Sequence, residues 1–370
     1  MASQNRTHAS DRGKVIPDLP SVPTIGTVTN TLLTASVPFT ITSIGGLPTS
    51  YTAISSPGSI TGTASSSPVT VSGLSQGTAY TFSVKANNAT GSSAFSSESN
   101  SITTPTYPTV TGGTLTSDST YYFRTFTGSG TLGISGGTLE FDYVIAAGGG
   151  GGGAAYAAAG GGGGGGGLLT GTTSASANQT VTVGAGGVGA YGTTPPGSDS
   201  VLGSLTAIGG GGGGKNSGQP PTGGSGGGAG GYTTSAISGG LGTSGQGNNG
   251  GNNPGYDHSG AGGGGKGAAG SSNTSVNGGN GGNGVTSTIY SSANGGLSAG
   301  GGGAGYTGTI GNPGAYGTGQ GGKATIQTPS DGTANCADGG GGAYSFNNNY
   351  WGGTGGSGVV AVRYLKTAVA

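Results

Sequence analysis

Residues 146–169 read AAGGGGGGAAYAAAGGGGGGGGLL, so six glycines, a short patch centred on Tyr156 and eight further glycines follow one another. Glycine has no side chain to bury and loses more backbone freedom on ordering than any other residue. Such a run is normally a flexible linker. If it is ordered, neighbouring segments must supply the hydrogen bonds of its backbone. The stretch therefore decides between a disordered linker and a block of packed glycine segments.

Glycine is distributed unevenly along the chain. Of the 96 glycines only nine precede Pro108, and 87 fall in the last 263 residues. The glycine-rich part is almost uncharged and carries repeated tyrosines, whereas disordered chains are typically charged and poor in aromatic residues, so we expect it to be ordered. We predict an N-terminal anchoring arm at 1–20, a β-domain at 21–106 and a glycine-rich domain at 107–370.

The charge and the cysteine content exclude several classes of function. Ten basic and ten acidic residues are present, without the clusters of Lys and Arg that a nucleic-acid binder needs, so nucleic acid is not an expected partner. The one cysteine, Cys336, cannot form an intrachain disulfide and has no nearby Cys or His at metal-ligand spacing. The N-terminus lacks the apolar stretch of a signal peptide, and no segment approaches a membrane span, so we expect synthesis in a host cytoplasm without export.

The segment from Val22 to Thr104 alternates apolar and polar residues in short runs broken by turn formers, which is typical of an antiparallel β-sandwich. The clearest strand places one face in the core and leaves the other in water. Its predicted core face consists of Tyr80, Phe82, Val84 and Ala86.

Two stretches of this domain resemble known sequences. Residues 73–105, GLSQGTAYTFSVKANNATGSSAFSSESNSITTP, look like the last three strands of a fibronectin type III domain, and residues 48–74 look like its middle strands. The resemblance implies that the Tyr80 hydroxyl bonds back to the backbone and that Phe39 replaces the tryptophan of many such domains. It also implies a role as a spacer or docking module.

The glycine-rich domain fits one ordered structure better than the others. Collagen requires glycine at every third position, and the runs here are unbroken. A phosphate-binding loop fails at Lys215, because Asn216 follows where Ser or Thr is needed. Polyglycine II remains: an extended helix whose N–H and C=O groups all point outward to neighbouring helices. One such helix cannot be stable alone, because ordering a residue costs about 1–2 kcal/mol and a hydrogen bond returns about 0.5–1.5.

Strand-like segments at 120–149, 178–187 and 356–366 precede, interrupt and end the glycine block. Together with the block they resemble the glycine-rich domain of phage tail fibres, adhesins and related virion proteins. We therefore expect an all-β protein: a fibronectin III-like β-sandwich plus a glycine-rich domain of packed polyglycine II helices closed by β-strands.

Chemistry at a catalytic or metal centre is not expected. His258 is the only histidine of the large domain, and although Asp257 could orient it, no Ser or Cys motif accompanies the pair. The run GGNGGNG at 278–284 carries Asn where calcium-binding glycine repeats use Asp. The sequence therefore predicts neither an enzyme nor a cofactor or metal site.

A binding role has more support, because aromatic and amide side chains gather in turns between the glycine runs. The strongest cluster is AYSFNNNYWGG at 343–353, with weaker ones at 252–260 and 312–319. An alternative is that these rings only cap the exposed ends of the glycine block. The candidate receptor-binding residues are Tyr344, Phe346, Asn347, Asn348, Asn349, Tyr350, Trp351, Tyr256, Asp257, His258 and Tyr316.

The sequence thus favours a bacteriophage virion protein: a tail fibre or adhesin whose receptor-binding glycine-rich tip serves host attachment. Its expected partners are other virion proteins, through the N-terminal arm, and a host cell-surface glycan or outer-membrane protein. A capsid decoration protein or head fibre that stabilises the particle or aids nonspecific adhesion is the main alternative. A bacterial surface adhesin is less favoured, and a homo-oligomer stays open.

Overall fold

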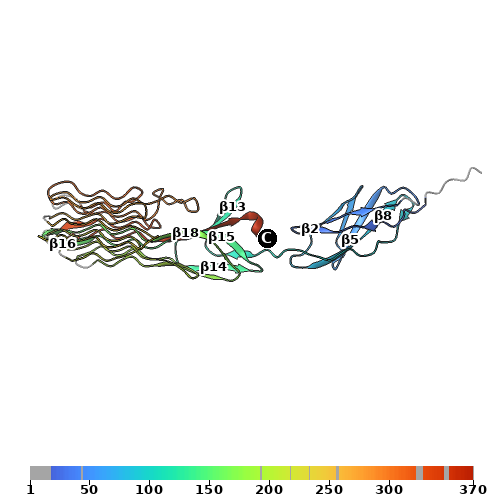
Figure 1. Ribbon diagram of the computed structural model, residues 1–370, viewed down its shortest axis with the longest axis horizontal. Coiled ribbons are helices and arrows are strands. Elements are labelled where there is room, and N and C mark those ends of the chain that lie inside the picture. Colours follow the sequence, from blue (N-terminus) through green and yellow to red (C-terminus); the bar gives the residue numbers. More distant parts are fainter. Residues whose placement is uncertain are drawn as a thin grey trace, which may run out of the picture. The chain divides into compact units, whose positions relative to one another are not determined.

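A computed structural model describes residues 18–369, except 43–44, 192–193, 217, 233, 256–257, 322–327 and 346–349. The chain divides into two compact units at the boundary between Tyr107 and Pro108. Most of the predicted arm lies outside the described residues. In the described part every regular element is a strand except one short 3-10 helix, η1 (Lys366–Ala368), which confirms the all-β prediction (Figure 1).

Unit 1 consists of short antiparallel strands in three sheets. Their orders are β10-β8-β5-β6, with β9 also paired to β8; β2-β3-β7; and β1-β4. The strands are β1 (Thr24–Ile25), β2 (Thr29–Thr31), β3 (Thr34–Val37), β4 (Phe39–Thr40), β5 (Ser50–Ser56), β6 (Thr61–Ala64), β7 (Val69–Ser72), β8 (Ala79–Asn88), β9 (Gly91–Ser92) and β10 (Ile102–Thr103).

The core of unit 1 follows the alternation of β8. Tyr80, Phe82, Val84 and Ala86 are all buried, as the period of two predicts. They pack in one cluster with residues of β3, β5 and β7. Phe39 is buried beside Tyr51, with ring centroids 4.3 Å apart.

The chain after β9 covers the edge of β8 without forming a regular strand. Three serines each donate their backbone N–H to a β8 carbonyl and accept the N–H of the same β8 residue on their hydroxyl. The pairs are Ser93 with Ala86, Ser96 with Val84 and Ser99 with Phe82. The serines thus satisfy an edge that would otherwise expose unpaired backbone groups.

Unit 2 begins with two five-stranded sheets. Their orders are β11-β14-β19-β21-β22 and β12-β13-β24-β15-β18, and an apolar cluster drawn from both sheets includes Leu132, Phe141 and Val362. The strands are β11 (Thr109–Thr111), β12 (Thr114–Ser117), β13 (Tyr121–Phe126), β14 (Gly130–Ser135), β15 (Leu139–Ala146), β18 (Leu168–Ala175), β19 (Gln179–Thr182), β21 (Ser200–Leu202), β22 (Leu205–Ala207) and β24 (Val359–Leu365).

The glycine block continues from these sheets as layers of extended chain (Figure 1). β15 runs directly into the first glycine run, and β24 follows the last glycine pair of the block. A small sheet, ordered β17-β23-β16-β20, lies at the end of the block remote from β13, β15 and β24. Its strands are β16 (Gly153–Tyr156), β17 (Ala158–Ala159), β20 (Ala190–Tyr191) and β23 (Ala343–Ser345). We call this remote end the tip.

The longest glycine run is bonded on all sides to other segments. Its successive N–H groups donate to three neighbours in turn, and the same neighbour returns at every third residue. These neighbours are the segments 208–214, 261–264 and 337–343. Its carbonyl groups accept from three further segments, which are 147–153, 225–228 and 298–304. The run therefore depends on other segments of the chain, most of them distant in sequence, for these bonds.

Side chains are excluded from this run by the closeness of the neighbours. A Cβ built on Gly163 would overlap the carbonyl oxygen of Gly150, and one built on Gly164 would overlap that of Ser225. Glycine is required at these positions because only a bare Cα lets two backbones approach so closely.

Candidate functional site

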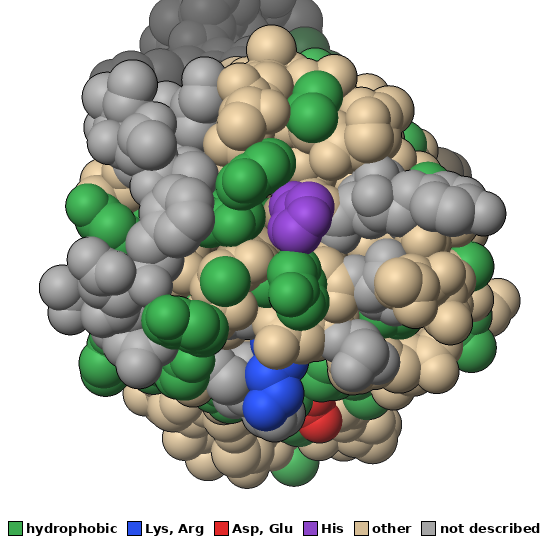
Figure 2. Space-filling model, turned by 90° about the vertical axis from the view of Figure 1, so that its left-hand side faces the viewer, with side chains coloured by type: hydrophobic (Ala, Val, Ile, Leu, Met, Phe, Trp, Pro, Cys, Tyr) green, Lys and Arg blue, Asp and Glu red, His purple; other side chains and the backbone are tan. Residues whose placement is uncertain are grey.

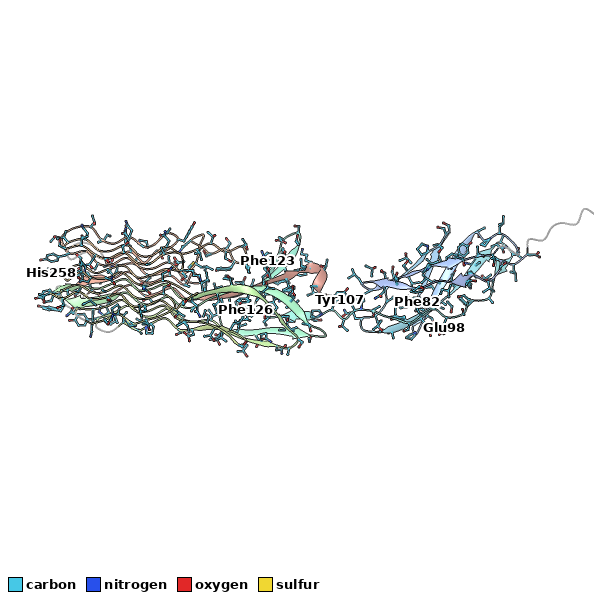
Figure 3. All side chains as sticks on the ribbon, viewed as in Figure 1. Phe82, Glu98, Tyr107, Phe123, Phe126 and His258 are labelled. Carbon is cyan, nitrogen blue, oxygen red and sulfur yellow. The ribbon has the colours of Figure 1, made fainter. Side chains whose placement is uncertain are left out.

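A row of aromatic rings crosses the tip. The centroid distances are 5.1 Å from Tyr232 to His258, 4.9 Å from His258 to Tyr306 and 5.3 Å from Tyr306 to Tyr344. His258, the only histidine among the described residues, lies at the middle of this face between hydrophobic side chains (Figures 2 and 3). Tyr344 is buried at one end of the row, whereas Tyr232 is exposed at the other. The aromatic row thus leads from the interior of the block to its surface.

The buried amide of Asn253 holds the backbone beside this row. The Asn253 amide donates to the Gly230 carbonyl at 2.7 Å, and its carbonyl oxygen accepts the Gly255 N–H at 2.9 Å. Ile237 packs behind them against Ala229 and Ala261. The loops that carry Tyr232 and His258 are therefore anchored to the glycine block, which fixes the positions of their rings.

The row is electrically neutral at its inner end. Burial raises the pKa of Tyr344 to about 12, and the neighbouring Tyr306 hydroxyl adds to the increase. The phenol therefore keeps its proton at any physiological pH. Nδ1 of His258 is buried and has no hydrogen-bond partner among the described residues.

Four further aromatic side chains lie exposed on segments of the tip, and we call them the rim. Tyr156 is 57% exposed, Tyr191 43%, Tyr350 41% and Trp351 60%. Three of them lie on neighbouring segments. β16 and β20 pair in parallel, and the chain at Gly352 is in contact with both Gly152 and Gly189. Tyr156, Tyr191 and Trp351 therefore lie exposed on neighbouring segments of the tip.

The structure brings four of the predicted residues to the tip: Tyr344, His258, Tyr350 and Trp351. Phe346, Asn347, Asn348, Asn349, Tyr256 and Asp257 lie outside the described residues. Tyr316 lies elsewhere, at the opposite end of the block. The residue before it, Ala315, accepts the Gly284 N–H on its carbonyl oxygen. Val285, which follows Gly284 in the chain, packs with Val144 and Val359 beside the sheets.

Sequence reasoning missed four tyrosines of the tip: Tyr156, Tyr191, Tyr232 and Tyr306. Each stands within three positions of the end of a glycine stretch. These tyrosines could have been predicted from that spacing, because the chain leaves the packed block where a glycine run ends. Tyr316 shows the weakness of the signal, since a run has two ends and tyrosines follow runs at both.

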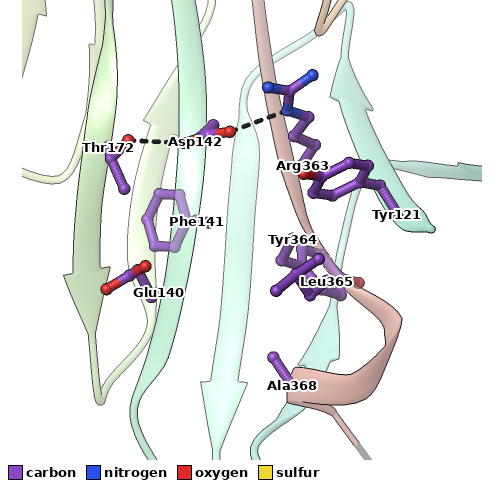
Figure 4. A pocket seen from close by; sticks show the side chains of 9 residues that line it. All are labelled: Tyr121, Glu140, Phe141, Asp142, Thr172, Arg363, Tyr364, Leu365 and Ala368. Atoms are coloured by element: carbon purple, nitrogen blue, oxygen red, sulfur yellow. Dashed lines mark hydrogen bonds and ion pairs between the residues drawn. The ribbon is translucent and has the colours of Figure 1, made fainter.

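The sheet end of unit 2 carries a charged groove of about 470 Å³ across β13, β24, β15 and β18 (Figure 4). Nε of Arg363 donates to Oδ2 of Asp142 at 2.9 Å, and the guanidinium lies 4.8 Å from the centre of the Tyr121 ring. The Thr172 hydroxyl bond and then Arg363 hold the pKa of Asp142 below its usual range. Because these charges already satisfy one another, we assign them to joining β15 and β24 rather than to a ligand.

Among the described residues no helix is long and apolar enough to cross a membrane. That part of the chain also contains no group of three or more His, Cys, Asp or Glu side chains that could hold a metal ion.

Comparison with known families identifies the larger unit. The family model for the glycine-rich domain matches residues 124–365, which run from within β13 through the block to the end of β24. The chain therefore belongs to the glycine-rich domain family. No curated protein matches it.

Proposed function

We propose that this protein is a structural protein of a bacteriophage particle, a tail fibre or adhesin that attaches the particle to its host through the tip. One observation carries the proposal: exposed aromatic side chains gather at the end of a block whose glycine segments are joined by many backbone hydrogen bonds. Large exposed aromatic residues mark interaction sites, and a rigid support lowers the entropy cost of binding.

We further infer that the glycine segments are polyglycine II helices. The return of the same neighbour at every third residue supports this, because that helix has three residues per turn. Such a block leaves few flexible stretches for a protease, which suits a protein outside the cell.

Unit 1 acts in this proposal as a fibronectin type III-like spacer. Its sandwich strands and one specific bond support the resemblance: the Tyr80 hydroxyl accepts the Ser75 N–H at 3.0 Å, as expected of a corner tyrosine. The arm at 1–20 would join the particle.

The test locates the protein on intact particles and measures attachment. Gold-labelled antibody against unit 2 should mark the tail in electron micrographs, and purified full-length protein should compete with particles for adsorption to host cells. Label on the capsid without competition would contradict the proposal and favour the decoration protein or head fibre.

A further inference from the structure

The four rings of the rim differ from those of the row in what surrounds them. Each ring of the row contacts at least one other ring of the row. Among the described residues, none of the rim rings stacks on another aromatic ring, and all four are between 41% and 60% exposed. The rim therefore offers separate, open ring faces, whereas the row has much of its ring surface already covered.

The surface around the rim carries little charge. Figure 2 shows the described part of the tip face as mostly uncharged polar and hydrophobic, with basic and acidic side chains confined to one small area. An acidic polymer would need clustered basic residues to hold it. The charge pattern thus favours a ligand without net charge.

We propose that the rim binds a neutral glycan of the bacterial envelope, which deepens the proposed function and rests on it. The slightly positive C–H groups of a sugar face suit the negative face of an aromatic ring, and each isolated ring can take one sugar face. The sugar hydroxyls can bond to the uncharged polar groups of the tip face. A protein partner would instead favour contiguous anchors buried together at the centre of an interface.

The row has a different part in this arrangement. Its inner ring, Tyr344, belongs to β23, which pairs with β16 through Tyr156 and Ser345. The row therefore supports the strand that presents Tyr156, and its truncation should lower stability as well as binding. Truncation of a rim residue should lower binding alone.

The experiment uses the purified full-length protein, labelled with a fluorophore, and a panel of intact bacteria. Cells of a strain that binds the protein are treated with periodate, which cleaves sugar diols, or with proteinase K. We expect periodate to abolish binding. Trp351→Ala and Tyr191→Ala should each weaken binding about tenfold, equivalent to about 1.4 kcal/mol. Added salt should change binding little.

Tyr316→Ala is the matched control, since Tyr316 is as exposed as Tyr191, at 43%, but lies at the opposite end of the block. It should bind like the parent protein. Because Trp351 is the only tryptophan, its emission gives a second measurement: carbohydrate released by mild acid from the bound strain should shift it.

The outcomes separate the two proposals. Binding to no strain in the panel would overturn the proposed attachment function. Binding that survives periodate would overturn the glycan while leaving attachment in place. Folded Trp351→Ala and Tyr191→Ala variants that bind as tightly as the parent would remove the rim from the site.

Discussion

At the scale of single residues, the glycines of the longest run act by the absence of a side chain rather than by an unusual backbone angle. No glycine between Gly160 and Gly167 has a positive φ. What distinguishes them is that a Cβ would meet backbone atoms of another segment. Backbone cannot move aside as a flexible side chain can. Even one added methyl group would therefore force two packed segments apart.

Gly163→Ala should therefore destabilise unit 2 by roughly 1–3 kcal/mol or more, the usual cost of overpacking. Gly128→Ala is the control, because a Cβ there meets nothing within 4 Å, and its effect should stay within about 0.5 kcal/mol. Thermal or denaturant unfolding followed by circular dichroism measures both. Equal stabilities of the two variants would contradict close packing around Gly163.

Asp338 is a buried carboxyl inside the block. Burial raises its pKa to about 8, although its oxygens accept the Asn294 amide at 2.8 Å and the Ala299 N–H at 3.2 Å. Between about pH 4 and pH 8 the folded protein keeps this proton while the unfolded chain loses it. The contribution of Asp338 to the free energy of unfolding is therefore greatest at acid pH and is lost as the pH rises toward 8.

The melting temperature should accordingly fall between pH 5 and pH 8.5. Asp338→Asn, which stays uncharged, should flatten that dependence while costing some stability at pH 5 through one altered hydrogen bond. Differential scanning calorimetry across this range checks both statements. A parent protein that melts at the same temperature at both pH values would show that the carboxyl is not protonated when buried.

At the scale of elements, the edge of the glycine block is closed by a ladder of asparagines. Oδ1 of Asn277, Asn280 and Asn283 accepts a backbone N–H of the neighbouring segment at 2.8, 2.9 and 2.9 Å. The donors are Thr309, Asn312 and Ala315. Asparagine recurs at every third position, so each amide oxygen accepts an N–H of the same neighbouring segment.

Asn280→Ala should cost about 1 kcal/mol, because the Asn312 N–H loses its acceptor. Asn280→Asp keeps an oxygen in place and should lose less. Urea unfolding of the three proteins gives the comparison. An alanine variant as stable as the parent would mean that water replaces the amide at no cost.

At the scale of the whole molecule, each unit has its own core, and the larger one is assembled from segments that are remote in sequence. The ion pair between Asp142 and Arg363 joins residues 221 positions apart, and β24 lies between β13 and β15. The sheet from which the glycine block continues is therefore complete only when the last strand is in place, which predicts that unit 2 unfolds as one cooperative unit.

Much of this architecture could be predicted from the sequence, but the site could be predicted only in part. The alternation at Tyr80 to Ala86 identifies a core strand, because a period of two leaves no other face for the apolar side chains. Trp351 and Tyr350 can be predicted as site residues because several aromatic residues lie close to them in the sequence. Tyr156, Tyr191, Tyr232 and Tyr306 stand alone in the sequence, and only the fold gathers them.

The sequence by itself determined the all-β class, the change of composition near Pro108 and the need for glycine to pack on bare backbone. These follow from local pattern and from the lack of a side chain. Only the tertiary structure decided which segments surround each run, which N–H groups the asparagines of GGNGGNG accept, and which tyrosines reach the tip. The reason is physical: a glycine run has no side-chain pattern to specify a partner, so its neighbours are chosen by where the turns fall and by the closure of the whole block.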